Sequence, residues 1–206
     1  MRTLVIDCAT EACSVALFED GTLLAGEMRM LGRGHAEQLV PMISALPDRG
    51  RAARIAAALG PGSFTGVRVG VAAAKALALA WRAELVGYAT PALVAAMARG
   101  RHATAVGVAM TAGHGEWFVQ EFGADGLPVA ALAALAPAAA ASALSSELVA
   151  GSQAEALIAQ RGWGSALPLW PDAREFASLD AASLTAQVAP LYGRSPDARL
   201  PQEQAN

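Results

Sequence analysis

The stretch that decides the fold is residues 55–88, IAAALGPGSFTGVRVGVAAAKALALAWRAELVGY. Its first five residues are apolar on both faces, as the interior strands of parallel sheets are. A loop of small residues, Gly60–Gly66, follows, and the Ala-rich stretch Val67–Trp81 is long enough for a helix. A second short apolar strand is expected at Leu85–Tyr88. A strand, a helix and a strand in this order make a parallel crossover, so the sequence predicts an α/β protein.

Upstream of this unit, the pattern predicts an antiparallel meander followed by one helix. Asp20-Gly21 is a hairpin signal between two alternating segments. The three strands are expected at Thr3–Asp7, Ser14–Glu19 and Thr22–Met28. The helix is expected over His35–Leu46, where Pro41 should kink it or restrict it to a loose first turn.

Downstream, a helix is expected at Pro91–Arg99, and after residues 100–102 the pattern restarts. The repeated order of strand, hairpin and helix suggests a duplicated unit with a trimmed second copy. We therefore expect one lobe at residues 1–101 and a second at 102–206, whose end, Arg194–Asn206, is predicted to be an extended or mobile tail. The elements of the second lobe are expected at Thr104–Met110, Glu116–Phe122, Leu127–Ala130, a helix after Pro137, Glu147–Ala150, Gln153–Arg161 and a last helix at Asp180–Ala189.

Composition excludes several classes of protein. The chain has 206 residues, of which 54% are hydrophobic and 16% charged, which is typical of a folded chain. Its net charge of −3 provides no basic footprint for autonomous nucleic-acid binding. Two cysteines, Cys8 and Cys13, are too few for a secreted disulfide framework, and no signal-peptide core follows Met1. We therefore expect a cytoplasmic protein with no membrane span.

The glycine loop is the sharpest local motif. A loop of small residues that leads into a helix N-terminus presents free N–H groups and can hold an anion, with Gly62, Ser63 and Thr65 as candidate contacts. The loop lacks the Lys-Ser/Thr pair of a Walker motif and is a poor dinucleotide fingerprint. The alternative is that its glycines permit a tight turn and close packing. Both interpretations stay open at this point.

Other chemistry is weakly indicated. Asp7 ends a strand and Thr10 follows it, so the two could face a metal-bound phosphate or could cap the turn. The three histidines have no metal-ligand spacing, and there is no GxSxG nucleophile elbow. From the residues alone we predict no catalytic group and no metal site.

Several stretches together resemble one family. They are Ile6-Asp7 with Ala9–Leu17, His35–Ile43, Gly60–Gly70 (GPGSFTGVRVG), Gly115-Glu116 and Pro190–Tyr192. They are similar to the TsaB (YeaZ) family of bacterial tRNA threonylcarbamoyladenosine biosynthesis proteins, strongly over residues 1–90 and more thinly to about 196. The resemblance implies a duplicated actin-like, Hsp70-like (ASKHA) α/β fold, with two lobes of mixed sheets flanked by helices and the second lobe reduced.

The same resemblance implies a function. A TsaB-type chain is a non-catalytic scaffold that pairs with the catalytic subunit TsaD and works with the ATPase TsaE. The complex transfers a threonylcarbamoyl group to the adenosine beside the tRNA anticodon, so tRNA, ATP and the metal are held by the partners. No cofactor is then expected on this chain, while weak nucleotide binding and a homodimer of the isolated chain are left open.

The resemblance also implies an interface, a bundle built on the two helices His35–Leu46 and Val67–Trp81. The second helix has a face of small residues, which would let a partner helix approach closely. We expect the face to be completed by apolar residues of both helices. The predicted partner interface consists of Leu39, Ile43, Leu46, Gly66, Val67, Gly70, Val71, Ala74 and Leu77.

The chain differs from the catalytic subunit at the positions of that subunit's metal-binding motif. The HxEGH metal motif of that subunit corresponds here to Thr90, Ala92 and Val94, and neither Thr nor Val replaces an imidazole ligand. Thr111 stands where an Asp is usual, which puts the role of its loop in doubt, and Cys8 replaces a usual Thr. The alternative function is a nucleotide-binding or metallopeptidase-like (glycoprotease-type) enzyme of the same fold.

Overall fold

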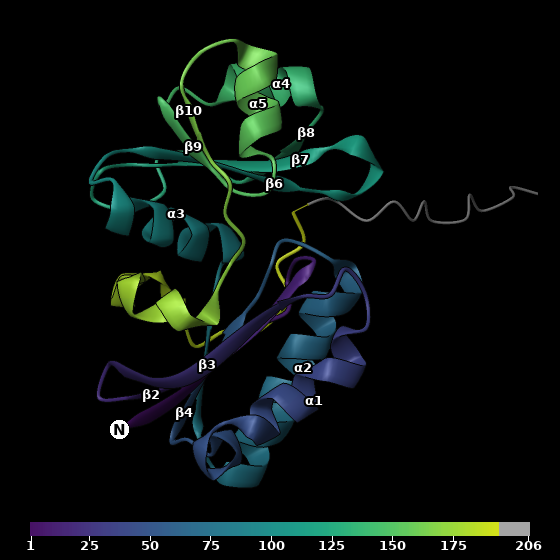
Figure 1. Cartoon of the computed structure of the whole chain (residues 1–206), viewed down its shortest axis with the longest axis vertical. Helices are drawn as coiled ribbons and strands as arrows, with labels where there is room; N and C mark the ends of the chain where they lie inside the picture. Colours follow the sequence, from purple (N-terminus) through teal and green to yellow (C-terminus); the bar gives the residue numbers. More distant parts are fainter. Residues whose placement is uncertain (194–206) are drawn as a thin grey trace, which may run out of the picture.

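The chain folds into two lobes, each built on one mixed sheet (Figure 1). The computed structural model describes residues 1–193. The strands of the first sheet run in the order β11-β5-β4-β1-β2-β3, and those of the second in the order β10-β9-β6-β7-β8. The α/β class and the two lobes of mixed sheets expected from the sequence are confirmed.

The first sheet joins the antiparallel meander to the parallel crossover. β1 (Arg2–Asp7), β2 (Ala12–Glu19) and β3 (Thr22–Met30) pair antiparallel, with Leu4 opposite Leu17. β4 (Arg54–Ala58) pairs parallel with β1, and β5 (Glu84–Tyr88) pairs parallel with β4. β1 therefore lies in the middle of the sheet, and its side chains are buried from Leu4 to Asp7.

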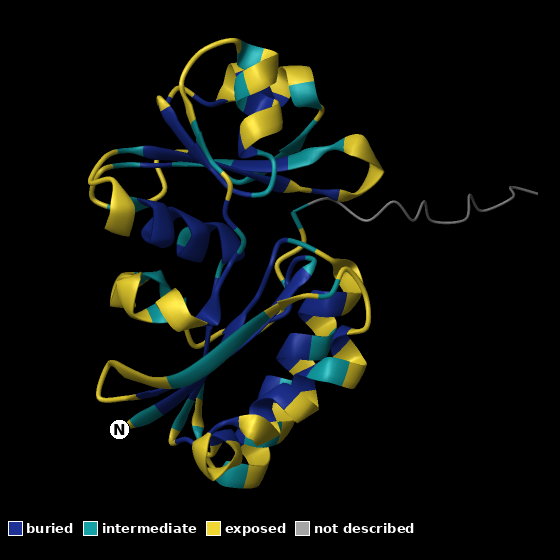
Figure 2. Cartoon of the chain, in the orientation of Figure 1, coloured by how far each residue is buried: buried dark blue, intermediate teal, exposed yellow. Residues whose placement is uncertain are grey.

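Two helices cover one face of this sheet, and a third lies between the lobes, against the second sheet (Figures 1 and 2). α1 (His35–Ala45) and α2 (Phe64–Trp81) lie side by side on the outer face, and a 3-10 turn, η1 (Pro47–Gly50), follows α1. α3 (Thr90–Arg101) lies between the lobes and is buried along most of its length. α2 is the one helix in the described part of the chain that is apolar and long enough to span a membrane, and its inner face packs on β4 and β1 as a covering helix.

The second lobe repeats the plan with shorter elements. β6 (Val106–Thr111) and β7 (Trp117–Phe122) pair antiparallel around a short 3-10 turn, η2 (Gly113–Gly115), and β8 (Ala133–Leu135) continues the meander. α4 (Pro137–Ala143) then leads to β9 (Leu148–Ala150), and α5 (Ala154–Arg161) leads to β10 (Ser165–Leu167). The order of elements matches the first lobe, so the second is a reduced copy.

The chain returns to the first lobe after β10, contrary to the predicted lobe boundary. The segment contains the 3-10 turns η3 (Ala173–Ser178) and η4 (Ala181–Ser183) and the strand β11 (Leu184–Thr185), which pairs antiparallel with β5. We call residues 170–193 the return segment. The expected lobe at 102–206 is therefore wrong for these residues, because the free edge of β5 offers them backbone hydrogen-bond partners.

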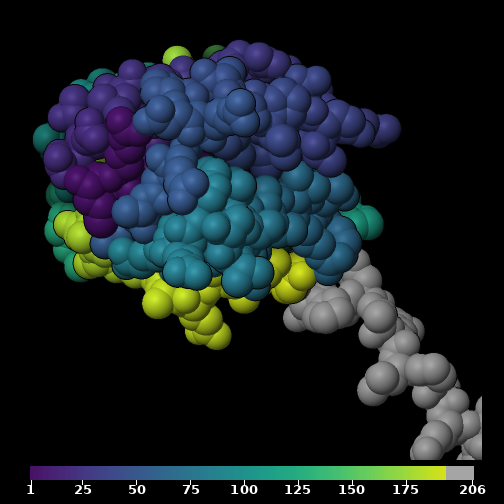
Figure 3. Space-filling view, turned by 90° about the horizontal axis from the view of Figure 1, so that it is seen from below, coloured from purple at the N-terminus to yellow at the C-terminus, as the bar shows by residue number. Residues whose placement is uncertain are grey.

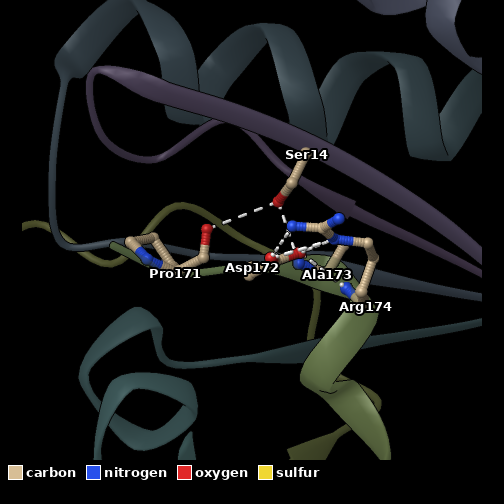
Figure 4. Close-up of polar contacts among 5 residues, drawn as sticks. All are labelled: Ser14, Pro171, Asp172, Ala173 and Arg174. Carbon is tan, nitrogen blue, oxygen red and sulfur yellow. Dashed lines mark hydrogen bonds and ion pairs between the residues drawn. The ribbon is translucent and has the colours of Figure 1, made fainter. Parts of the chain in front are cut away.

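The buried hydroxyl of Ser14 on β2 fixes the start of the return segment (Figure 4). Ser14 Oγ accepts a hydrogen bond from Ala173 N at 2.9 Å and donates one to the Pro171 carbonyl at 3.4 Å. Next to it, the Arg174 guanidinium forms an ion pair with Asp172 at 2.6 Å. Ser14 and Ala173 are both buried, so this contact attaches the return segment to β2 inside the first lobe.

Three sequence-based expectations differ from the structure. Pro41 does not interrupt α1, since it lies on the exposed side of the helix, where water can solvate the carbonyl that its missing N–H leaves free. No strand forms at residues 127–130, where Pro128 makes only one bridge to Phe122 and pairing resumes at β8. The predicted helix at 180–189 is instead η4 and β11. The predicted tail, 194–206, lies outside the described residues.

Candidate functional site

A cleft of about 660 Å³ separates the lobes at the N-terminus of α2. The glycine loop and the turn between β1 and β2 form one wall, and the turn between β6 and β7 forms the opposite wall. Residues 190–193 of the return segment close one side. The polar or charged residues that line the cleft are Thr10, Glu11, Ser63, Arg68, Thr111, His114 and Tyr192.

The glycine loop is shaped by packing against the first hairpin. A Cβ on Gly62 would overlap the carbonyl of Ala9, and a Cβ on Gly66 would overlap the carbonyl of Cys8. Ser63 N donates a hydrogen bond to Ala9 O at 2.7 Å, which holds the loop against the hairpin turn. These glycines therefore permit a close approach of two backbones, which is the second of the two interpretations left open by the sequence.

The polar side chains of the predicted anion site mostly serve the chain itself. Ser63 Oγ caps α2 by accepting a hydrogen bond from Gly66 N at 3.2 Å. Thr10 Oγ1 accepts a hydrogen bond from Ala12 N at 3.2 Å, and the Thr10 carbonyl accepts one from the buried ring of His35 at 2.8 Å. Thr65 is exposed on the first turn of α2 and does not line the cleft. Of the predicted contacts, Thr10, Gly62 and Ser63 do line it.

Asp7 is buried below the cleft and does not line it. Its Oδ1 accepts a hydrogen bond from Ala9 N at 2.9 Å, and its Oδ2 accepts one from the Tyr88 hydroxyl at 3.2 Å. Burial raises the pKa of the Asp7 carboxyl from 3.8 to about 7, against the smaller lowering effect of these two bonds. Of the two interpretations left open for Asp7, the structure shows the turn cap, since the carboxylate accepts the Ala9 N–H and also bonds Tyr88 at the end of β5.

The charged groups on the rim of the cleft are also engaged. The Arg68 guanidinium lies 3.5 Å from the centre of the Phe64 ring and donates a hydrogen bond to the Tyr192 hydroxyl at 2.9 Å. Glu11 Oε1 accepts a hydrogen bond from the Trp170 indole at 2.6 Å. Both contacts join the first lobe to the return segment, so these side chains position the wall of the cleft.

Thr111, where the family resemblance led us to expect an Asp, lies in the second wall of the cleft. Thr111 Oγ1 accepts a hydrogen bond from Gln153 Nε2 at 2.8 Å and lies 3.3 Å from Ser152 Oγ. These contacts link the end of β6 to the turn before α5. The Thr111 hydroxyl therefore has a structural role.

The residues that the family resemblance aligns with the metal motif of the catalytic relative lie at the start of α3, inside the protein. Thr90 and Val94 are fully buried, and the Thr90 hydroxyl has no hydrogen-bond partner among the described groups. One hydroxyl and one alkyl side chain do not form a ligand set for iron or zinc. Within residues 1–193, no cluster of three or more His, Cys, Asp or Glu side chains is arranged to hold a metal ion.

The predicted partner face is the core of the first lobe and not its surface. Ala74 is fully buried and packs in the same apolar cluster as Leu39 and Ile43. The small residues of α2 let the helix approach its own hairpin, since Gly70 directly faces Cys8. Only Leu77 remains half-buried. The expectation of an exposed face is therefore wrong for Leu39, Ile43, Leu46, Gly66, Val67, Gly70, Val71 and Ala74.

The surface of the same two helices nevertheless carries an apolar groove. It has a volume of about 370 Å³ and lies between α1 and α2, on the face seen in Figure 3. Val40 is 61% exposed at its edge, and Leu79, on the outside of α2, is 84% exposed. Apolar lining comes from Val40, Ile43, Ala73, Ala76, Leu77 and Trp81, and polar lining from Ser44, Asp48, Arg49 and Arg51.

These features define a two-lobed α/β protein with the duplicated actin-like fold, in whose described residues no cluster of three or more His, Cys, Asp or Glu side chains could hold a metal ion. The chain belongs to the family described as TsaD, tRNA N6-adenosine threonylcarbamoyltransferase, whose family model matches residues 29–175.

Individual relatives agree with this assignment and confirm the resemblance to TsaB and YeaZ. The chain is 41% identical over 131 residues to the tRNA threonylcarbamoyladenosine biosynthesis protein TsaB of Escherichia coli K12, a match that covers 61% of this chain and 56% of the relative. It spans about half the length of the curated relatives it matches.

Solved structures extend the likeness over the whole fold. YeaZ from Pseudomonas aeruginosa matches with a TM-score of 0.76 at 28% identity, over 93% of this chain and 99% of that one. The ethanolamine utilization protein EutJ from Carboxydothermus hydrogenoformans matches with a TM-score of 0.51 at 12% identity, over 87% of this chain and 90% of that one, which shows the shared fold alone.

Proposed function

We propose that this chain is a non-catalytic subunit of the assembly that forms threonylcarbamoyladenosine in tRNA, and that it pairs with a TsaD-type catalytic subunit in the cytoplasm. The observation that carries the proposal is the pair Thr90 and Val94, both without an imidazole, at the positions that the family resemblance aligns with the metal-binding histidines of the catalytic relative. The family match supports a role in forming threonylcarbamoyladenosine. The residues at positions 90 and 94 support a non-catalytic role beside a catalytic partner.

The α1–α2 groove supports the pairing itself. Val40 lines the groove and is 61% exposed, so the groove leaves contiguous apolar side chains uncovered, as partner sites do. A catalytic subunit of the same family would carry an equivalent pair of helices, so two such pairs can pack as a four-helix bundle. The proposed interface is therefore the outer side of the predicted helices, with Val40, Ala76, Leu77 and Trp81 in the groove.

The remaining roles fall to the partners. A TsaE-type ATPase would supply ATP chemistry, and tRNA would be bound through the complex, in keeping with the net charge of −3 on this chain. The Gly62–Thr65 region would hold a nucleotide weakly at most, because its glycines and hydroxyls are used in packing and capping. The isolated chain would use the same groove to form a homodimer.

Reconstitution tests the proposal. Purified TsaD-type subunit, tRNA and a threonylcarbamoyl donor are incubated with and without this chain and a TsaE-type ATPase, and modified adenosine is measured. We expect product only when the catalytic subunit and this chain are both present. Modification by this chain alone would instead support the alternative, an enzyme of the same fold.

A further inference from the structure

The two cysteines of the chain form a buried pair at the base of the first hairpin. Cys8 directly follows β1, and Cys13 lies near the start of β2. The sulfur atoms are 3.4 Å apart, and both side chains are buried. The residues between the two cysteines include Ala9, Thr10 and Glu11, which line the wall of the interlobe cleft.

The register of the hairpin places the two residues directly opposite each other. β1 and β2 pair antiparallel as far as Asp7 opposite Ser14, so the next step along the ladder puts Cys8 opposite Cys13. Directly opposed residues of an antiparallel pair have Cα atoms about 4.5 or 5.5 Å apart, and disulfides accept about 4.4–6.8 Å. A bond between the sulfurs therefore needs little backbone movement.

The four residues between the cysteines hold several elements together. The carbonyl of Ala9 accepts a hydrogen bond from Ser63 N, and that of Glu11 accepts hydrogen bonds from Leu31 N and Gly32 N, both at 2.9 Å. This turn thus connects the start of α2 with the end of β3, besides its bonds to His35 and Trp170. A covalent link at its base would hold all of these contacts in place.

We propose that Cys8 and Cys13 are an oxidation site that closes to an intrachain disulfide and locks the hairpin turn lining the cleft. The oxidant class is a small peroxide that can reach the pair when the turn opens. The Cys13 thiolate attacks hydrogen peroxide to form a sulfenic acid and release hydroxide. The Cys8 sulfur then attacks that sulfenic sulfur, its proton leaves with the displaced hydroxide as water, and the disulfide forms. In total, two thiols are oxidised and one peroxide is reduced to two waters.

The hydrogen bond between the thiols supports this order of events. Donation from Cys8 lowers the pKa of Cys13, against the opposing effect of burial. The same hydrogen bond, together with burial, raises the pKa of Cys8. Because the two thiols share one hydrogen bond, the thiol that ionises accepts it from the other, and we assign the attacking role to Cys13.

A peptide map tests the proposal, because Glu11 lies between the two cysteines. The folded full-length chain is treated with hydrogen peroxide, unfolded with an alkylating agent, and cut after Glu residues without reduction. We expect the peptides on either side of Glu11 to stay joined, with the mass of two hydrogens lost and no alkylation. Separate alkylated peptides, or peptides carrying sulfinic acid, would overturn the proposal.

Thermal unfolding provides the second readout. Closing a short loop should raise the Tm of the peroxide-treated chain by ~4–8 °C, and a reducing agent should reverse the rise. Cys8→Ala is the matched control, because it keeps Cys13 and every methionine and should show no rise. A rise of the same size in Cys8→Ala, or no rise in the native chain, would contradict the disulfide.

Discussion

At the scale of single residues, some polar side chains that the sequence suggested as ligand contacts instead form hydrogen bonds within the chain. Asp7 illustrates this, since its carboxyl is buried and accepts hydrogen bonds from the Tyr88 hydroxyl and the Ala9 N–H. The sequence shows a strand-end acid, but it does not show that residues 81 positions away will cover it. Burial, and not residue type, decides whether such a carboxylate can face a ligand.

The raised pKa of Asp7 predicts how stability depends on pH. The unfolded carboxyl titrates near its ordinary value of 3.8, and the folded one at about 7, so the folded chain binds the extra proton between these values. Stability contributed by this group is present below about pH 4 and is lost as the pH rises towards about 7. Asp7→Asn should therefore be more stable than the native chain at pH 8, and its Tm should depend less on pH between 5 and 8.

The exposed Glu155→Gln substitution is the control for this measurement, because Glu155 lies on the surface of α5. Its pH profile should follow that of the native chain. If Asp7→Asn also kept the native profile, the assignment of the slope to Asp7 would be wrong.

A substitution at Ala74 tests whether this face of α2 is part of the core or part of an interface. Its side chain is fully buried among Leu39, Ile43 and their neighbours, so a Trp there has no space. Ala74→Trp should lower the free energy of unfolding by about 2 kcal/mol or more, within the range of overpacked cores. Urea denaturation measures it, with Ala76→Trp on the exposed side of α2 as the matched control.

At the scale of elements, sequence periodicity predicts the helices and most strands well. β1 to β5 and α1 to α3 lie where the alternation, the Gly and Pro signals and the Ala-rich stretches place them. The return segment was not predicted, because its residues 184–185 form a strand only by pairing with the edge of β5. The cluster of Phe64, Arg68 and Tyr192 was missed for the same reason, since it joins residues far apart in the chain.

Ser14 should control how firmly the return segment is attached. Ser14→Ala removes the acceptor of the Ala173 N–H and leaves that group buried and unpaired. The expected cost is about 1–3 kcal/mol in the free energy of unfolding, measured by urea denaturation. Hydrogen exchange should also speed up in residues 171–176, whereas Ser142→Ala, on exposed α4, should leave both unchanged.

At the scale of the whole molecule, the duplicated fold provides a cleft between the lobes and an apolar groove on the outer helices. The two features differ in how far their side chains are already engaged within the chain. The cleft walls are held by contacts within the chain. The groove between α1 and α2 leaves apolar side chains uncovered. We therefore propose that the outer helical surface carries the function of this chain.

The charge of the molecule predicts weak RNA binding by the isolated chain. Arg54 pairs with Glu84 at 2.8 Å, and Arg99 donates a hydrogen bond to the Ala124 carbonyl, so both of these arginines are already engaged within the chain. Fluorescence anisotropy with tRNA at physiological salt should give a Kd weaker than about 1 μM, and a steep loss with added salt. Submicromolar binding would contradict the assignment of tRNA contact to the partners.

The central claim is that the α1–α2 groove binds the catalytic subunit, and its most direct test is the affinity of that pairing. Isothermal titration calorimetry compares the native chain, Val40→Asp in the groove, and Leu23→Asp on the distant strand β3 as a matched exposed control. We predict that Val40→Asp weakens binding of the TsaD-type subunit by about 2 kcal/mol or more, roughly thirtyfold, while its Tm and the affinity of Leu23→Asp stay near native. Native affinity in Val40→Asp, with loss in Leu23→Asp, would contradict the account.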